Sequence, residues 1–291
     1  MFAGSALQVG EGVSIPDGRQ QATRADHGPA TNGNYRGDSV DNEHMHVLAS
    51  SGHPPEDSEL AKVPTEFAEA QTDTRIVYHT EPRSASADRF RLLRMRLREM
   101  QSANKLKSIL VTSPLPHDGK STVALNLATV LAEHGKRTVL VIEGDLHRPT
   151  LAQQLGLKSG PGLADYLAGE GEAFSALRRI EPLGWYLLAA GKAPFNPTEL
   201  LQTEALTNLI QALSPAFEWI LIDSPPVVPL ADTLALAKST DGSLLIVKAG
   251  HTPRRSVEDA ITLLGRQKVL GIVLNGMKGL DRYYSGYGHY Y

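Results

Sequence analysis

Short apolar runs alternate with longer amphipathic stretches over most of the chain beyond residue 107. Uninterrupted runs of Val, Ile and Leu are typical of strands buried on both faces, and helices between such strands make a sheet mainly parallel. The pattern therefore predicts an α/β fold in which helices flank a mainly parallel sheet, with ligands bound at the carboxyl ends of the strands. The predicted strands are 108–112, 138–142, 185–188, 219–222, 243–247 and 270–274, and the predicted helices are 120–134, ended by Gly135, and 198–213.

The two ends of the chain differ in composition from the middle. Residues 1–75 are rich in Gly, Ser, Asp, Asn, His and Pro and carry few large apolar side chains. Such a segment cannot bury enough surface to offset the entropy lost on ordering, so we expect it to be disordered. An ordered domain is expected over 76–280, and residues 281–291 are expected to form a flexible tail rich in tyrosine.

A basic amphipathic helix is predicted at 84–100, before the first long apolar run. Apolar side chains recur there at helical spacing, and arginines occupy the opposite face. A surface helix packed on the core explains this pattern as well as a functional helix does. The apolar positions are Phe90, Leu93, Leu97 and Met100, and the basic ones are Arg91, Arg94 and Arg98.

Composition narrows the classes of function. The 291 residues suit one large domain with an appendage, and the 41% hydrophobic and 21% charged fractions are those of a globular protein. A formal net charge of −3 provides no global basic field, so no nucleic-acid partner is expected. The lack of cysteine excludes disulfides, zinc–thiolate sites and thiol nucleophiles. We find neither a signal peptide nor a run of roughly 18 apolar residues, so neither secretion nor a membrane span is expected.

The first predicted strand leads into Ser113-Pro-Leu-Pro-His-Asp-Gly-Lys-Ser-Thr122, and a helix follows at once. This is the arrangement of a P-loop, in which backbone N–H groups at a helix N-terminus surround phosphate oxygens. Gly119 lets the backbone approach the phosphates, and Lys120 can reach the β- and γ-phosphates. Ser121 can ligate Mg²⁺, and Thr122 can contact the α-phosphate. A strand-to-helix turn that reads Gly-Lys-Ser by chance is the alternative.

Acidic residues follow two further strands. Glu143 and Asp145 follow the second strand, and alternation along an extended segment directs both carboxylates to the same side. Beside a P-loop they can hold metal-bound water or accept a proton from an attacking hydroxyl; an acidic loop in which Asp145 caps the next helix is the alternative. Asp223, after the fourth strand, has the position of a Walker B carboxylate, which binds Mg²⁺ through water. Asn275, after the last strand, is a candidate adenine contact or part of an Asn-Gly turn.

The chain closes with a cluster of tyrosines among Gly and Ser. Such a segment has nothing to pack against in a core, whereas its hydroxyl groups are accessible phosphoryl acceptors. A sticky low-complexity tail and an RNA-stacking segment are the alternatives, and a single Arg without Lys weighs against the second of them. The tyrosines are Tyr283, Tyr284, Tyr287, Tyr290 and Tyr291.

These motifs resemble, in the same order, those of the bacterial tyrosine kinases (BY-kinases) of capsule and exopolysaccharide export in their stand-alone cytoplasmic form. The resemblance covers residues 80–291. The DGKST segment looks like the family's Walker A, 143–149 like its Walker A′, and 223–226 like its Walker B. The segment 189–201, AAGKAPFNPTELL, resembles the family's Gly-Pro-Asn-Pro-x-Glu-Leu segment, and the tail resembles its tyrosine cluster.

The resemblance implies autophosphorylation of the tail with ATP and Mg²⁺. It also implies a cytoplasmic protein recruited to the inner face of the plasma membrane by a transmembrane chain-length regulator, opposed by a tyrosine phosphatase. Asp88-x-x-Arg91-x-x-Arg94 is similar to the helix motif through which family members form rings. The implied site comprises catalytic Lys120, Glu143, Asp145 and Asp223; nucleotide-binding His117, Asp118, Gly119, Lys120, Ser121, Thr122 and Asn275; and metal-binding Ser121, Asp145 and Asp223.

Two positions depart from the family pattern. Glu143 stands where the family usually has Asp, and His117 stands where it usually has Gly. A P-loop ATPase switch of the ParA/MinD type is the second candidate, but its deviant Walker A carries a lysine where this chain has Leu115. A catalytically inactive nucleotide-binding subunit of a polysaccharide export complex is the third candidate.

Overall fold

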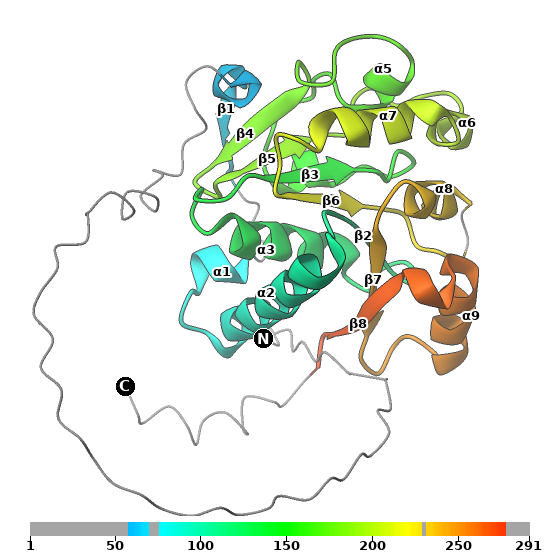
Figure 1. The fold of residues 1–291 in the computed structure, drawn as a ribbon. Coiled ribbons are helices and arrows are strands. Elements are labelled where there is room, and N and C mark those ends of the chain that lie inside the picture. Colours follow the sequence, from blue (N-terminus) through cyan, green and yellow to red (C-terminus); the bar gives the residue numbers. More distant parts are fainter. Residues whose placement is uncertain (1–57, 70–75, 229–230, 278–291) are drawn as a thin grey trace, which may run out of the picture. The chain divides into compact units, whose positions relative to one another are not determined.

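The computed structural model describes residues 58–69, 76–228 and 231–277, which all belong to one compact unit. In this part of the chain eight strands form one sheet, in the order β1-β4-β5-β3-β6-β2-β7-β8 (Figure 1). Neighbouring strands are parallel except β4 and β5, so the predicted mainly parallel sheet is confirmed. The strands are β1 (Thr65–Phe67), β2 (Ser108–Thr112), β3 (Val139–Glu143), β4 (Leu177–Glu181), β5 (Trp185–Leu188), β6 (Trp219–Asp223), β7 (Gly242–Lys248) and β8 (Val269–Asn275).

The strands lack polar alternation because their side chains alternate between two apolar cores, one on each face of the sheet. Ile109 and Val111 of β2 pack into the first core, whereas Leu110 packs into the second. The same alternation recurs in β3, β6 and β7. Each apolar run of the sequence therefore supplies both cores.

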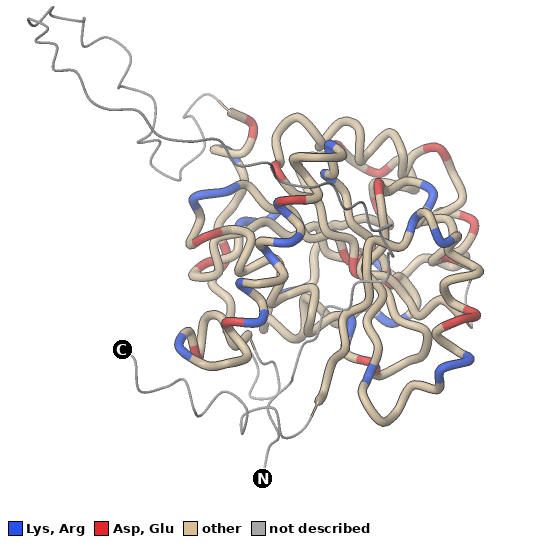
Figure 2. Tube along the Cα trace, turned by 60° about the horizontal axis from the view of Figure 1, so that its bottom comes forward, with Lys and Arg blue, Asp and Glu red and all other residues tan. Residues whose placement is uncertain are grey.

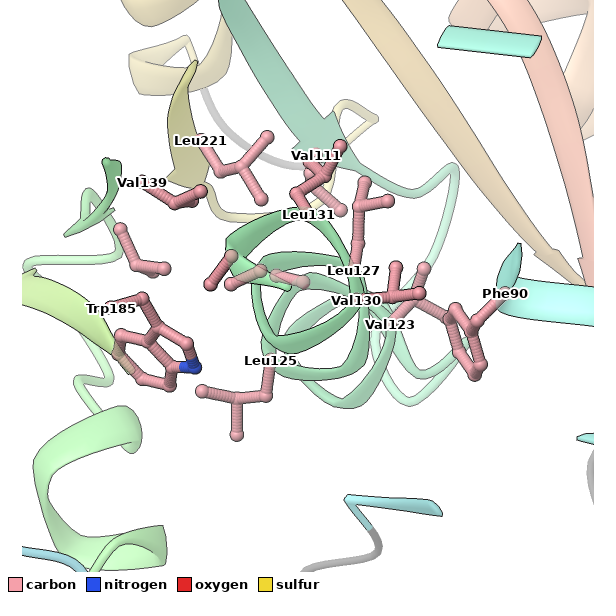
Figure 3. Close-up of a cluster of buried hydrophobic side chains, with 14 of the residues drawn as sticks. Phe90, Val111, Val123, Leu125, Leu127, Val130, Leu131, Val139, Trp185 and Leu221 are labelled. Atoms are coloured by element: carbon pink, nitrogen blue, oxygen red, sulfur yellow. The ribbon is translucent and has the colours of Figure 1, made fainter. Parts of the chain in front are cut away.

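The first face of the sheet packs against α1 (Val77–Thr80), α2 (Ala85–Asn104) and α3 (Lys120–Ala132) (Figure 1). Apolar side chains of the sheet and of α2 surround α3, among them Phe90 and Trp185 (Figure 3). The Trp185 ring is fully buried, and its indole N–H donates a hydrogen bond to Thr129 Oγ1 at 3.0 Å. Because α3 is enclosed on all sides, residues 123–132 are all buried.

The second face packs against five helices, whose apolar side chains form the second core. They are α5 (Leu163–Leu167), α6 (Pro197–Leu201), α7 (Glu204–Leu213), α8 (Asp232–Lys238) and α9 (Arg254–Leu264). The remaining described helices are the short α4 (Leu151–Gln154) and the 3₁₀ turns η1 (Glu59–Lys62) and η2 (Arg266–Lys268). Within the described ranges no helix has both the length and the apolar composition needed to cross a bilayer.

Regular structure begins earlier in the chain than composition predicts. The expectation that residues 1–75 are disordered is wrong for 58–69, where β1 pairs in parallel with β4 and Ala68 N donates to Glu181 O at 2.8 Å. Pairing with a sheet edge satisfies backbone polar groups in a segment that has few apolar side chains. The rest of the predicted disordered region, 1–57 and 70–75, lies outside the described residues.

The predicted helix 198–213 is two helices, α6 and α7. Thr203 interrupts it with an extended backbone (φ −79°, ψ 158°), and its hydroxyl donates to Leu200 O at 2.7 Å. Ser and Thr hydroxyls that bond to a nearby backbone group compete with helix continuation. The hydrophobic periodicity runs across this break and therefore does not reveal it.

Both long helices on the first face end at other residues than predicted. Helix α3 ends at Ala132, and Glu133 takes a left-handed conformation with φ 49°. The Glu133 carboxylate lies 3.2 Å from Arg94 Nη1 and 2.5 Å from Arg98 Nη2, so this end of α3 is tied to α2. Helix α2 continues to Asn104, beyond the predicted end at 100.

Candidate nucleotide-binding site

The polar residues predicted to form the site converge at one edge of the sheet. Strands β3, β6, β2 and β7 are consecutive neighbours and parallel, so their carboxyl ends lie side by side. Glu143 lies opposite Asp223 in the β3–β6 ladder, and Asp223 lies opposite Val111 near the end of β2. The P-loop follows β2 directly. Three strand ends therefore contribute to one site.

The P-loop connects β2 to α3 through two left-handed residues, His117 (φ 66°) and Gly119 (φ 95°). At Gly119 there is also no room for a side chain, because a Cβ would overlap the amide nitrogen of Asn275. Helix α3 starts at Lys120, so the unpaired N–H groups of its first turn lie at this edge of the sheet. A cavity of about 580 Å³ lies beside the loop, lined by Pro116, His117, Gly119, Lys120, Ser121, Thr122, Asp145, His147, Arg148, Thr150, Gln154 and Pro226.

Lys120 projects its ammonium group between a carboxylate and a hydroxyl. The Lys120 Nζ lies 3.5 Å from Asp145 Oδ2 and 3.3 Å from Ser121 Oγ. The side chains of Lys120 and Asp145 are only 16% and 11% exposed, so little water screens the pair. An anion that enters the cavity meets a fixed positive charge next to the α3 N-terminus.

Asp223 is buried, and its Oδ1 has no hydrogen-bond partner among the described residues. Burial raises the pKa of Asp223 to about 6, although the nearby Lys120 charge and a hydrogen bond from Ser121 act in the opposite direction. A buried carboxylate oxygen without a donor fits a bound cation or its water. Mg²⁺ keeps several waters and uses one or two carboxylates with substrate phosphates. The described chain holds no cluster of three acidic or histidine ligands, and this site does not need one.

Asp118 braces the P-loop and does not line the cavity. Its Oδ1 accepts a hydrogen bond from Thr252 Oγ1 at 2.6 Å, and its Oδ2 accepts one from Leu115 N at 3.2 Å. Its backbone carbonyl accepts a third from Asn275 Nδ2 at 2.9 Å. The side chain of Asp118 therefore shapes the loop from behind, and contact of Asp118 with the nucleotide stays a prediction. Contact of Asn275 with adenine stays a prediction.

Replacement of Thr252 by Val is expected to weaken the P-loop. The change keeps the shape of the side chain but leaves the buried Asp118 Oδ1 without its donor, which costs about 1–3 kcal/mol of folding free energy. Calorimetric melting should show a lower Tm, and titration with ADP should show weaker binding. Thr262→Val is the matched control, because Thr262 is exposed and its hydroxyl only donates to Glu258 O within α9. Equal effects of the two substitutions would contradict the bracing role.

The Glu143 carboxylate is directed into the protein, although it lies next to Asp223 in the ladder. Glu143 is 1% exposed and does not line the cavity. Burial raises the pKa of Glu143, and hydrogen bonds from the backbone of Leu151, Ala190 and Thr150 partly oppose this. The expectation that Glu143 and Asp145 face the same side is wrong, because β3 ends at Glu143 and strand alternation does not extend to Asp145.

The loop after β3 supplies further side chains to the cavity, to which sequence reasoning assigned no role. His147, Arg148 and Thr150 line the cavity together with the P-loop residues. The His147 Nε2 lies 2.6 Å from Oδ2 of the buried Asp232 at the start of α8. The position of His147 shortly after Asp145 is a signal that could have identified it. The contact with Asp232 depends on the fold and has no sequence signal.

The sequence is similar to proteins that are named as tyrosine-protein kinases. The chain is 32% identical over 217 residues to the tyrosine-protein kinase YwqD of Bacillus subtilis (strain 168), which covers 74% of this chain and 90% of YwqD. The chain belongs to the bacterial tyrosine-protein kinases. No family model matches this kinase chain.

The kinase chain is also similar to part of a longer protein and to a solved structure. It is 33% identical over 226 residues to the succinoglycan biosynthesis transport protein ExoP of Rhizobium meliloti (strain 1021), but it spans only 29% of that protein. The crystal structure of the chimerical protein CapA2B2 superposes with a TM-score of 0.66 and 28% identity, over 75% of this chain and 96% of that one.

The residues of the predicted ring motif make contacts within their own kinase chain. Arg91 Nη1 lies 2.6 Å from Asp88 Oδ1, and the Arg91 guanidinium lies 5.1 Å from the centre of the Tyr78 ring. Arg94 pairs with Glu133, which directly follows α3. Basic and acidic positions are likewise interspersed along the rest of the described chain (Figure 2). Contact of this motif with a neighbouring copy stays a prediction.

Proposed function

We propose that this kinase transfers the γ-phosphate of ATP to tyrosines of its own C-terminal tail. The observation that carries the proposal is the group of Lys120, Asp145 and Asp223 at three adjacent strand ends beside a P-loop. Phosphoryl transfer needs mainly positioning and compensation of charge on the phosphates. This group offers one fixed cation, one carboxylate in the cavity and one buried carboxylate oxygen without a partner.

Each residue of the P-loop has a role that follows from its position. The Lys120 ammonium would neutralise charge on the β- and γ-phosphates, and the backbone from His117 to Thr122 would surround their oxygens. Ser121, Asp145 and Asp223 would hold Mg²⁺, which when bound offsets charge on the phosphate oxygens. The tyrosine O–H bond breaks as its oxygen attacks the γ-phosphorus, the bond from that phosphorus to the bridging oxygen breaks, and ADP leaves. Asp145 is the cavity-lining carboxylate that can take up the tyrosine proton.

The departure point of the tail supports its role as the substrate. Strand β8 ends at Asn275, two strands from β2 and at the same edge of the sheet as the P-loop. Neighbouring strands lie about 4.8 Å apart, so the end of β8 lies about 10 Å from the strand that carries the P-loop. An extended chain spans about 3.3–3.6 Å per residue, so tyrosines in the tail can reach their own site or that of a neighbouring copy. The proposed acceptors, Tyr283, Tyr284, Tyr287, Tyr290 and Tyr291, lie outside the described residues.

The proposed cellular setting is the export of capsule or exopolysaccharide. Relatives such as ExoP support it, since their names refer to polysaccharide biosynthesis and transport. We propose that the chain works in the cytoplasm, and that a transmembrane chain-length regulator recruits it to the inner face of the plasma membrane. We also propose that the chain forms a homo-oligomeric ring through α2. A tyrosine phosphatase would reverse the modification. In a ring each copy would meet its neighbour's tail at a high effective concentration.

One experiment distinguishes the candidate functions. The purified chain is incubated with ATP and Mg²⁺, and both phosphotyrosine and released phosphate are then measured. The kinase proposal expects phosphotyrosine that increases with time. Phosphate release without phosphotyrosine would instead indicate an ATPase switch. The absence of both, with nucleotide still bound, would indicate a regulatory subunit.

A further inference from the structure

The Glu143 side chain joins three parts of the backbone at the end of β3. Its Oε1 accepts hydrogen bonds from Thr150 N and Leu151 N, each at 2.5 Å, and its Oε2 accepts one from Ala190 N at 3.1 Å. Thr150 and Leu151 stand at the start of α4, and Ala190 follows β5. The carboxylate thus closes the loop of residues 144–150 onto the strand from which it departs and ties it to a neighbouring strand end.

The same loop carries Asp145 to Lys120. Gly144 N donates to Asp223 O at 2.7 Å, and Asp145 Oδ1 accepts from Arg148 N at 3.0 Å. These bonds leave Asp145 Oδ2 facing the Lys120 ammonium across 3.5 Å. The position of Asp145 in the cavity therefore depends on the path of the loop, and the two ends of that path are joined by Glu143.

The side-chain length of glutamate is needed for this closure. An aspartate at position 143 has one methylene less, so its carboxylate would fall short of the Thr150 and Leu151 amides unless the backbone moves. A rotation of Glu143 toward the cavity would likewise leave buried backbone N–H groups without acceptors, which is costly. Both oxygens are thus engaged where they are.

We propose that Glu143 is a positioning residue, which holds the 144–150 loop in place. The carboxylate that takes part in phosphoryl transfer is then that of Asp145, and not that of Glu143. The inference rests on the proposed phosphoryl transfer and assigns the roles of its two carboxylates. It replaces the expectation that Glu143 accepts the tyrosine proton. Glu143 acts only through Asp145 and the loop.

The order of activities among variants at position 143 distinguishes positioning from proton transfer. If Glu143 is a positioning residue, Glu143→Gln should keep phosphotransfer within about tenfold, because the amide oxygen still accepts from Thr150 N and Leu151 N and only the Ala190 N–H loses its acceptor. Glu143→Asp should lose about 10²-fold through misplacement of Asp145. If Glu143 were the proton acceptor, the order of the two activities would be reversed, because aspartate keeps the carboxylate and glutamine lacks it. A Gln variant less active than the Asp variant would overturn the proposal.

Amide hydrogen exchange of the nucleotide-free protein gives a readout that does not depend on kinase activity. Glu143→Asp should speed exchange at Thr150 and Leu151 by about tenfold or more, while Ile220 N, bonded to Lys107 O in the sheet, keeps its protection. Asp145→Asn is the matched control, since it removes the cavity charge but leaves these amides protected. Unchanged exchange at Thr150 and Leu151, or an equal loss at Ile220, would overturn the proposal. If the wild-type chain fails to phosphorylate tyrosine, the proposed function fails, and the exchange result still decides the role of Glu143.

Discussion

Replacement of Lys120 by Met is expected to lower the rate of tyrosine phosphorylation by about 10²–10³-fold. The methionine keeps most of the length and apolar contacts of the lysine stem but removes the ammonium group next to Asp145 and Ser121. Charge develops on the transferring phosphate next to the largely buried Lys120 side chain, so a fixed cation there contributes several kcal/mol to the stability of the transition state, by order of magnitude. The α3 N-terminus remains, so nucleotide should still bind, though more weakly.

Initial rates of phosphotyrosine formation, measured with radiolabelled ATP, give this effect directly. Lys62→Met is a suitable control, because the Lys62 side chain is 68% exposed and pairs only with Glu59 on the surface. The control should leave the rate unchanged. A Lys120→Met variant with nearly wild-type rates would mean that the P-loop does not carry the reaction.

Replacement of Asp223 by Asn is expected to stabilise the nucleotide-free protein and to abolish its Mg²⁺-dependent activity. Burial raises the pKa of Asp223 from its ordinary value of 3.8 to about 6. The folded state therefore binds the proton more tightly than the unfolded state, so stability falls as the pH rises from about 4 to about 6. Above that range the ionised, buried carboxylate costs about 3 kcal/mol, an order-of-magnitude value for a shift of this size. A neutral asparagine removes the cost of the buried charge but does not provide a carboxylate for Mg²⁺.

Chemical denaturation across pH measures both parts of this expectation. The stability gained by Asp223→Asn should be near zero below about pH 4 and largest above about pH 6. Asp241→Asn should have the opposite sign, because the Asp241 carboxylate accepts hydrogen bonds from Lys107 N, Ser108 N and the Ser108 hydroxyl. A destabilised Asp223→Asn protein at pH 7.5 would show that the carboxylate has partners other than a cation.

The buried centre of the sheet could be predicted from sequence because the pattern there is set by burial alone. Strands β2 and β5 have the predicted bounds, and every residue of both is buried. Strands β1 and β4 escaped prediction for a physical reason: β1 is a three-residue edge strand, and β4 reads LRRIE. In β4, Arg178 and Arg179 are held by acidic partners, Glu66 and Glu181, which the local pattern does not reveal.

The site was predictable as far as it depends on which strand ends meet. Lys120, Asp145 and Asp223 come together because parallel strands bring their carboxyl ends to one edge. The directions of individual side chains were not predictable. Asp118 turns to Thr252, which is 134 positions away in the sequence, and Glu143 turns to the backbone of α4. Both side chains bind groups that only the folded chain brings near them.

The proposed autokinase activity is tested most directly by mass spectrometric mapping of phosphate. The wild-type chain and a chain with Phe at the five tail tyrosines are both incubated with ATP and Mg²⁺ and then mapped. Each phosphotyrosine adds about −1.5 to −2 of charge, so modified species also separate clearly by charge. We expect phosphate on several of Tyr283, Tyr284, Tyr287, Tyr290 and Tyr291 in the wild-type chain, and the loss of nearly all incorporation in the Phe variant. Phosphate found only outside residues 283–291, or equal incorporation into both chains, would contradict the proposed autokinase activity.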